Sequence, residues 1–267
     1  MLNQLKLENA AQRFVSESAL NRVTLEKAQQ TISLFDMPLV GYASAEDELF
    51  DVFLRPEVIG PHFLRPREWL ESAQTVISFF LPFSEAVRKS NRAQQSMPSE
   101  GWLYGRIEGQ QFVNALCEEL AEKLREVGYQ AVVPSSSERF WTVSGMDEAG
   151  RSFTSNWSER HVAYACGLGT FGLSKGLITE RGMAGRFGSL ITDWHADPTP
   201  RAYSQVYEYC IRCGKCVERC PGHAISLETG KSHDQCRSYQ KGIRPQLLPR
   251  FGCGLCQTDV PCESCRP

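Results

Sequence analysis

The sequence predicts an α/β domain followed by a small cysteine-rich unit. In roughly the first three quarters of the 267 residues, short apolar runs rich in β-branched and aromatic residues alternate with helix-like segments. Nine of the eleven cysteines lie between Cys210 and Cys265. Residues 193–204, with two prolines and few apolar side chains, resemble a connector between these parts. We therefore expect two domains, residues 1–204 and 205–267.

The elements of the first domain follow from the spacing of apolar residues. Residues 108–127 give the clearest helix, with apolar side chains at four-residue steps and Gly128 at its end. Apolar positions at helical spacing also predict one or two helices within residues 5–34 and a helix at 158–166. Strands are predicted at residues 37–43, 75–83, 129–133 and 186–192. This alternation indicates a three-layer α/β domain.

Charge and hydropathy narrow the possible partners. The 29 basic and 31 acidic residues give a formal net charge of −2, so no global positive field attracts a nucleic-acid backbone. Residues 1–14 lack the apolar stretch of a secretory signal. The longest apolar run, residues 75–83, contains Pro82 and is far shorter than the roughly 20 residues that span a bilayer. We expect a cytoplasmic protein with no membrane partner.

The cysteine-rich unit opens with a specific motif. Cys210, Cys213, Cys216 and Cys220, followed by Pro221, have the spacing C-x2-C-x2-C-x3-C-P of bacterial ferredoxins. In this arrangement three thiolates face one [4Fe–4S] cube, and the fourth reaches a neighbouring cluster. The motif therefore implies a second cluster.

Later cysteines complete two ligand sets. We expect the first cluster to take Cys210, Cys213, Cys216 and Cys262, and the second to take Cys220, Cys236, Cys253 and Cys256. On spacing alone, Cys265 is the alternative to Cys262. Structural zinc and disulfides fit less well, because a structural zinc site takes four ligands in pairs. Cys117 and Cys166 lie in helical patterns, which predicts buried core residues.

Beyond the cysteines, the sequence resembles the iron–sulfur corrinoid proteins typified by epoxyqueuosine reductase and, more distantly, the reductive dehalogenases. The resemblance covers most of the chain. Its segments are VISFFLPF (76–83), YGR (104–106), CGLGTFGLSKGLI (166–178) and RFGSLITD (186–193), followed by CIRCGKCVERCP and FGCGLCQTDVPCE. The resemblance implies a nitroreductase-like α/β domain that binds cobalamin, whose cobalt the clusters reduce to nucleophilic Co(I).

Two of these segments supply cofactor candidates. Glycines let a backbone approach a bulky ring, and Lys175 could meet an anionic group. Taken alone, the glycines fit a tight helix-to-strand connection better, and the cysteine-rich unit beside them is what favours a cofactor role. The candidates are Gly167, Gly169, Phe171, Gly172, Lys175, Phe187, Gly188 and Ser189. FMN is the alternative cofactor, since nitroreductase-like folds commonly hold a flavin.

Tyr104 and Arg106 are the catalytic candidates. They lie between glycines in a predicted loop, where they could supply a proton or bind an acidic substrate group. An exposed surface turn is the alternative.

The sequence departs from the epoxyqueuosine reductase pattern at several places. The family's V-D-S-x-P segment aligns with SFTSNW, which puts Phe153 at the position of the catalytic Asp. Its D-Y-H after G-R is replaced by Ile107, Glu108 and Gly109. No D-x-H-x-x-G segment is present to provide a lower histidine ligand for cobalamin. The chain ends at Pro267 without the family's helical-repeat extension, so transfer RNA is not an expected partner.

Together these features predict a cobalamin-dependent iron–sulfur reductase. An external low-potential donor such as ferredoxin or flavodoxin would pass electrons through two clusters to a corrinoid, which reduces a small-molecule substrate. One alternative is an electron-transfer protein or corrinoid-reducing activator for a partner protein. Another is a flavin-containing iron–sulfur reductase.

Overall fold

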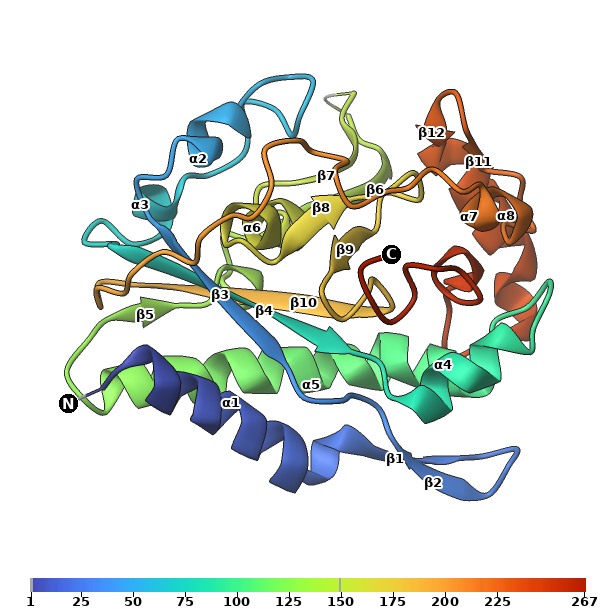
Figure 1. Ribbon diagram of the computed structural model, residues 1–267, viewed down its shortest axis with the longest axis horizontal. Coiled ribbons are helices and arrows are strands. Elements are labelled where there is room, and N and C mark those ends of the chain that lie inside the picture. The colour runs from blue at the N-terminus through green and yellow to red at the C-terminus, as the bar shows by residue number, and fades with distance from the viewer. Residues whose placement is uncertain (1, 149) are drawn as a thin grey trace.

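The computed structural model describes residues 2–148 and 150–267 (Figure 1). Its centre is a four-stranded antiparallel sheet in the order β3-β4-β10-β5. The four segments predicted as strands form this sheet: β3 is Leu39–Ser44, β4 is Thr75–Pro82, β10 is Gly185–Thr192 and β5 is Ala131–Val132. The predicted α/β architecture is confirmed.

Helices cover both faces of the sheet (Figure 1). Helices α1 (Gln4–Glu17) and α5 (Glu100–Arg125) pack on one face, and α6 (Glu159–Ala165) packs on the other. Strand β4 is buried along its whole length, because its alternate residues face cores on opposite sides of the sheet. Ile77 and Phe79 join the core beneath α5, whereas Val76 joins the core beside α6.

The N-terminal region differs from the prediction. Residues 5–34 were expected to be helical, but the helix ends at Glu17 and a hairpin of β1 (Arg22–Leu25) and β2 (Gln30–Ser33) follows. Only Leu25 and Ile32 are buried in the hairpin, so the apolar spacing there reflects strand alternation.

Smaller elements complete the α/β part of the chain: α2 Leu49–Val52, α3 Pro66–Trp69, α4 Glu85–Arg92, β6 Thr142–Met146, β7 Ser152–Ser155, β8 Gly169–Phe171 and β9 Leu177–Thr179.

Helix α5 begins eight residues earlier than predicted, at Glu100 rather than residue 108. The Ser99 hydroxyl caps it by accepting a hydrogen bond from the Trp102 backbone N–H at 3.1 Å. Gly105 disguised this start, since glycine lowers helix propensity. Its role here is packing: an added Cβ would lie 2.6 Å from Phe83 Cε1. The YGR segment is therefore helical and not a loop.

The cysteine-rich part lies at one end of the sheet (Figure 1). It contains α7 (Lys215–Glu218), the hairpin of β11 (Ile225–Ser226) and β12 (Gly230–Lys231), and α8 (His233–Ile243). The C-terminal residues then return to the α/β part, where the Met183 backbone N–H donates to the Cys262 carbonyl at 2.9 Å. Arg92 Nε also donates to Glu263 Oε1 at 2.9 Å. Within the described residues, no helix has the length and apolar character needed to cross a bilayer.

Candidate metal centre and adjoining pockets

Four cysteines from two parts of the chain surround one small pocket. They are Cys210, Cys213, Cys216 and Cys262, which we call the first cysteine set. The loop that carries three of them is tight, because Arg212 and Gly214 both have positive φ, at 51° and 78°. Gly172 lines the same pocket, and a Cβ there would lie 3.8 Å from Cys210 Sγ. The glycine loop after α6 therefore packs on the first set.

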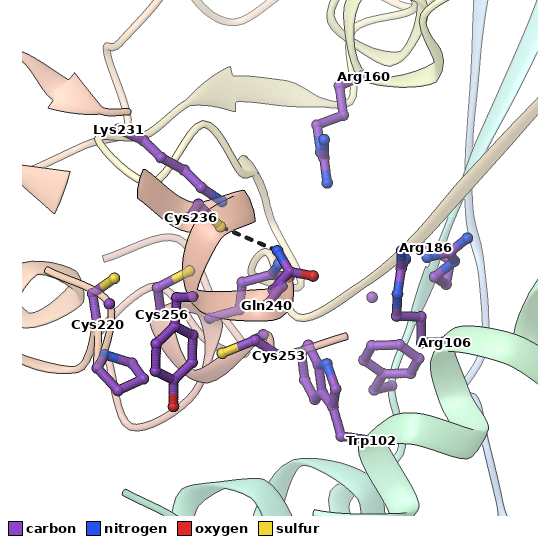
Figure 2. A pocket seen from close by; sticks show the side chains of 17 residues that line it. Trp102, Arg106, Arg160, Arg186, Cys220, Lys231, Cys236, Gln240, Cys253 and Cys256 are labelled. Atoms are coloured by element: carbon purple, nitrogen blue, oxygen red, sulfur yellow. Dashed lines mark hydrogen bonds between the residues drawn. The ribbon is translucent and has the colours of Figure 1, made fainter. Parts of the chain in front are cut away.

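The other four predicted ligands line a second pocket (Figure 2). This second cysteine set is Cys220, Cys236, Cys253 and Cys256. Cys220 follows α7, Cys236 lies on α8, and the last two flank Gly254, whose φ is +76°. Cys220 and Cys256 are buried, whereas Cys213 of the first set is exposed. The second set thus lies deeper in the molecule.

Burial and mutual repulsion act on the thiols of both sets. Burial, reinforced by neighbouring sulfurs of the same set, raises the pKa of Cys253 and of Cys262 to about 12. Burial also raises the pKa of Cys216 to about 11, and Cys256 of the other set is the thiol that adds most to this shift. Packing four such thiols together favours binding of iron, which neutralises their negative charge.

Hydrogen bonds reach two sulfurs of the second set. The Ala224 backbone N–H donates to Cys220 Sγ at 3.3 Å, and Gln240 Nε2 donates to Cys236 Sγ at 3.2 Å (Figure 2). Such bonds to sulfur tune the reduction potential of an iron–sulfur cluster.

The remaining cysteines lie apart from both sets. Cys265 is exposed, lines neither pocket, and donates to the Pro261 carbonyl at 3.5 Å. Cys117 and Cys166 are buried in the α/β part, and burial raises the pKa of both thiols. Among the residues that the structure describes, no three His, Cys, Asp or Glu side chains are arranged to hold a single metal ion.

Beyond the second set, the pocket continues between α5, α6 and β10 (Figure 2). Arg106, Arg160 and Arg186 line this part of the pocket, which we call the arginine chamber; the whole pocket, cysteine part included, has a volume of about 190 Å³. Trp102 and Phe83 form part of its wall. The chamber therefore joins three cations from three separate elements to the second cysteine set.

The three arginines lack carboxylate partners at hydrogen-bonding distance. No hydrogen bond or salt bridge joins Arg160 to another described residue, and its side chain points into the open centre of the chamber (Figure 2). The buried Nε of Arg106 has no hydrogen-bond partner in the part of the chain described. Arg186 donates to the Gln110 side chain, and burial, with repulsion from the other two arginines, lowers its pKa to about 9. Such a cluster is suited to an anion.

The carboxyl nearest Arg186 offsets little of this charge. Burial raises the pKa of Glu159 to about 8, against the opposing effects of Ser189 and Arg186, so the group is largely neutral at pH 7. Ser189 Oγ donates to Glu159 Oε2 at 2.7 Å and accepts from Trp157 Nε1 at 2.9 Å. Ser189, a cofactor candidate, is fully occupied by these core contacts.

A third pocket, of about 450 Å³, shares Arg106, Arg160, Lys231, Cys236 and Gln240 with the pocket of the second set. We call it the basic pocket. No Asp or Glu is among the described residues that line it. Its further lining residues are Ser144, Phe153, His233, Arg237, Lys241, Arg244, Phe251 and Gly252.

The two catalytic candidates face different surroundings. Arg106 lines both the chamber and the basic pocket, where its guanidinium lies 4.7 Å from the centre of the Phe251 ring. Tyr104 lines neither: its hydroxyl donates to Glu26 Oε1 at 3.1 Å, and Arg250 covers its ring at 3.6 Å. Only Arg106 is placed to meet a ligand.

Most of the cofactor candidates contact protein. A Cβ at Gly167 would lie 3.0 Å from Thr199 Cγ2, and one at Gly169 would overlap the Ile178 carbonyl. The first of these glycines follows α6 with φ +79°, so the tight connection explains both. Their role at a cofactor stays a prediction, and this packing does not support it.

The other candidates are divided between core and surface. Phe187 packs on Phe80 with ring centres 4.7 Å apart, and a Cβ at Gly188 would lie 2.5 Å from Phe79 Cζ. Phe171 packs on His161 at 5.0 Å, and Lys175 is exposed. Gly172 alone lines a pocket described above, that of the first cysteine set.

Sequence reasoning missed Arg160 and Arg186 as site residues. Arg186 carried a signal, because it is a charged residue in a strand that is otherwise apolar. Arg160 carried none, since a charged residue on a short amphipathic helix is ordinarily exposed to solvent. Trp102 was hidden because the start of α5 was not recognised.

Comparisons with known proteins agree with this arrangement. The 4Fe-4S binding domain family matches residues 203–226. An epoxyqueuosine reductase from Streptococcus thermophilus superimposes with a TM-score of 0.55 at 16% identity, over 98% of this chain and 66% of that one. No curated protein sequence is similar enough to count as a match.

Two further solved structures share the fold. An epoxyqueuosine reductase with an epoxyqueuosine-modified tRNA-Tyr stem loop gives a TM-score of 0.51 at 17% identity, over 84% of this chain and 61% of that one. A reductive dehalogenase described with a mechanism for B12-dependent dehalogenation gives 0.50 at 14%, over 76% and 27%. This chain thus spans less than two thirds of each solved chain. The resemblance expected from the sequence is confirmed for the fold.

Proposed function

We propose that this chain is an iron–sulfur reductase in which two [4Fe–4S] clusters deliver electrons to a ligand in the arginine chamber. One observation carries the proposal: each of two pockets is lined by one of the two cysteine sets, and the deeper one continues into the chamber. The two sets are neighbours, because Cys210 and Cys216 of the first set pack against the apolar cluster that contains Cys220 and Cys256 of the second. Two clusters held here would form a continuous path.

The exposure of the cysteines suggests the direction of electron flow. Cys213 is exposed, so an external donor such as ferredoxin or flavodoxin would reduce the first cluster. Cys220 and Cys256 are buried beside the chamber, so the second cluster would pass the electrons on. In this proposal residues 205–267 form an electron-transfer domain, which delivers electrons to the α/β domain at residues 1–204.

Cobalamin is the proposed cofactor, with FMN as the alternative, and the chamber would hold the cofactor's phosphate. Both carry a phosphate, and three arginines without carboxylate partners fit such a group. Arg106, Arg160 and Arg186 would hold the phosphate, while Trp102 and Phe83 would shield that side from water. A bound cobalamin would supply a cobalt centre that accepts single electrons and is strongly nucleophilic when reduced.

A small molecule is the proposed substrate, and Tyr104 has no role in this proposal because it does not line the chamber. The expectation that transfer RNA is not a partner has weaker support than the sequence suggested, since one neighbour in fold is complexed with a tRNA stem loop.

Anaerobic reconstitution with iron and sulfide, followed by cobalamin and a low-potential reductant, tests the proposal. The Cys265→Ser protein should bind cobalamin and give the Co(I) absorption spectrum, because Cys265 lies outside both sets. The Cys253→Ser protein should not give the Co(I) spectrum, because it lacks one thiol of the second set. Intact clusters with no change in the cobalamin spectrum would contradict the cobalamin assignment. A fluorescent extracted pigment would identify FMN, and reduction of only a partner's corrinoid would identify an activator.

A further inference from the structure

We infer that the basic pocket admits the substrate of the proposed reductase and that this substrate carries a phosphate or carboxylate group. That the bound anion is a substrate rests on the proposed function. The anion site itself rests on the residues that line the pocket, and it can be tested without turnover.

The charge in the pocket exceeds what either cofactor supplies. Six cationic side chains line it, and no acidic side chain among the described residues opposes them: they are Arg106, Arg160, Lys231, Arg237, Lys241 and Arg244. A phosphodiester such as that of cobalamin carries one negative charge, and a phosphate monoester such as that of FMN carries at most about two. Water and salt screen part of the repulsion between these cations, and bound anions lower it further. A second anionic molecule therefore fits the pocket.

Helix α8 and its neighbours hold the outer cations in place. Arg237, Lys241 and Arg244 follow one another at helical spacing at the end of α8 and just beyond it. A Cβ at Gly145 of β6 would overlap the Arg237 guanidinium, so the side chain lies directly on the strand. Arg244 lies 5.3 Å from the centre of the Phe251 ring. These contacts orient the cations before a ligand arrives.

The pocket leads toward the proposed redox centre. Arg106 and Arg160 line both it and the arginine chamber, where they would hold the cofactor's phosphate, so Arg237, Lys241 and Arg244 remain to bind an incoming anion. Cys236 and Gln240 of α8 also line both spaces. One helix thus carries a predicted cluster ligand together with cations of the pocket. An anion held by those cations lies next to the second cysteine set.

The neutral walls suit a small organic anion. Phe153 has φ +49°, and its ring lies 4.9 Å from the His233 ring and 6.0 Å from the Arg237 guanidinium. Phe251 forms the other aromatic wall. Aromatic faces beside cations accept the carbon skeleton of a ligand whose charged group is bound by the guanidinium groups.

Calorimetric titration of the anaerobically reconstituted protein with inorganic phosphate and with pyrophosphate tests the inference. We expect saturable binding that weakens about tenfold or more in the Arg237→Gln/Arg244→Gln double variant, because the anion loses its charge-assisted hydrogen bonds to both guanidinium groups. Arg13→Gln, at an exposed position of α1, is the matched control and should bind as the unmodified protein does. The absence of saturable binding, or equal affinity in both variants, would overturn the inference.

Two further titrations distinguish a substrate anion from the cofactor's phosphate and from nucleic acid. Titration repeated with saturating cobalamin or FMN should leave the binding unchanged, and competition would mean that the pocket holds the cofactor's own phosphate. A tRNA stem loop that binds far more tightly than pyrophosphate, through the same two arginines, would assign the pocket to nucleic acid. Iron content and the cobalamin spectrum of the same samples report on the proposed function separately. They should be unchanged in the double variant.

Discussion

Gly254 lies directly against the indole of Trp102: a Cβ added there would overlap Trp102 Cε2, Cζ2 and Nε1. Gly254 also has φ +76°, a conformation that other residues rarely adopt. It lies between Cys253 and Cys256, so this contact places two thiols of the second set against the start of α5. The arginine chamber adjoins the second set because of this close approach.

Replacing Gly254 with alanine should therefore remove the second cluster and keep the first. The backbone must shift to relieve the overlap with Trp102, and the shift displaces both flanking thiols. We expect iron per chain to fall by about half, as measured after anaerobic reconstitution.

Gly128→Ala is the matched control for this experiment. Gly128 also has positive φ, at 91°, but a Cβ there would meet nothing within 4 Å. Its iron content should equal that of the unmodified protein. A Gly254→Ala protein with its full complement of iron would contradict the proposed packing.

Cys262 and Cys265 differ in their expected contribution to the first cluster. Cys262→Ser removes a thiol that lines the first pocket, whereas Cys265→Ser changes an exposed thiol outside it. We expect loss or conversion of one cluster in the first variant only, seen in the electron paramagnetic resonance spectrum of the reduced protein. The opposite result would reassign the eighth ligand.

Gly105→Ala should destabilise the protein even though alanine is the better helix former. The gain in helix propensity is at most about 1 kcal/mol, whereas overpacking against Phe83 costs about 1–3 kcal/mol. Urea unfolding measures the difference. Gly242→Ala in α8, where a Cβ meets nothing within 4 Å, should be neutral or slightly stabilising. A stabilised Gly105→Ala protein would show that α5 can move away from Phe83.

Glu159 should make stability depend on pH. Burial raises its pKa to about 8 from the ordinary value of 4.5, so between these values the folded state holds a proton that the unfolded state releases. Stability from this group is thus present below about pH 4.5 and is lost as pH rises toward 8, at no more than about 1.4 kcal/mol per pH unit.

Urea unfolding at several pH values, followed by tryptophan fluorescence, measures this dependence. The Glu159→Gln protein should show a flatter decline between pH 5 and 8. Glu17→Gln, at an exposed position of α1, should keep the original decline. Equal slopes in all three proteins would mean that Glu159 stays ionised when folded.

Spacing predicted the two cysteine sets because a cube of iron and sulfur constrains the short loops that bind it. The same reasoning could not reach the arginine chamber, since Arg106, Arg160 and Arg186 lie on α5, α6 and β10. No local pattern joins residues that only tertiary packing brings together. Buried strands such as β4 were predictable because their apolar runs are continuous.

Glycines were ambiguous signals in the sequence. Gly105 suggested a loop, yet it lies in α5 because Phe83 occupies the space of its missing side chain. Gly169 suggested a nearby cofactor, yet its close neighbour is the backbone of Ile178. A glycine in a sequence indicates that something approaches closely, but only the fold shows what that neighbour is.

Iron per chain after complete anaerobic reconstitution tests the central proposal most directly. Two clusters held by the first and second cysteine sets require about eight irons per chain, with a similar amount of acid-labile sulfide. A stable content of about four irons, or zinc in place of iron, would contradict the proposed electron path.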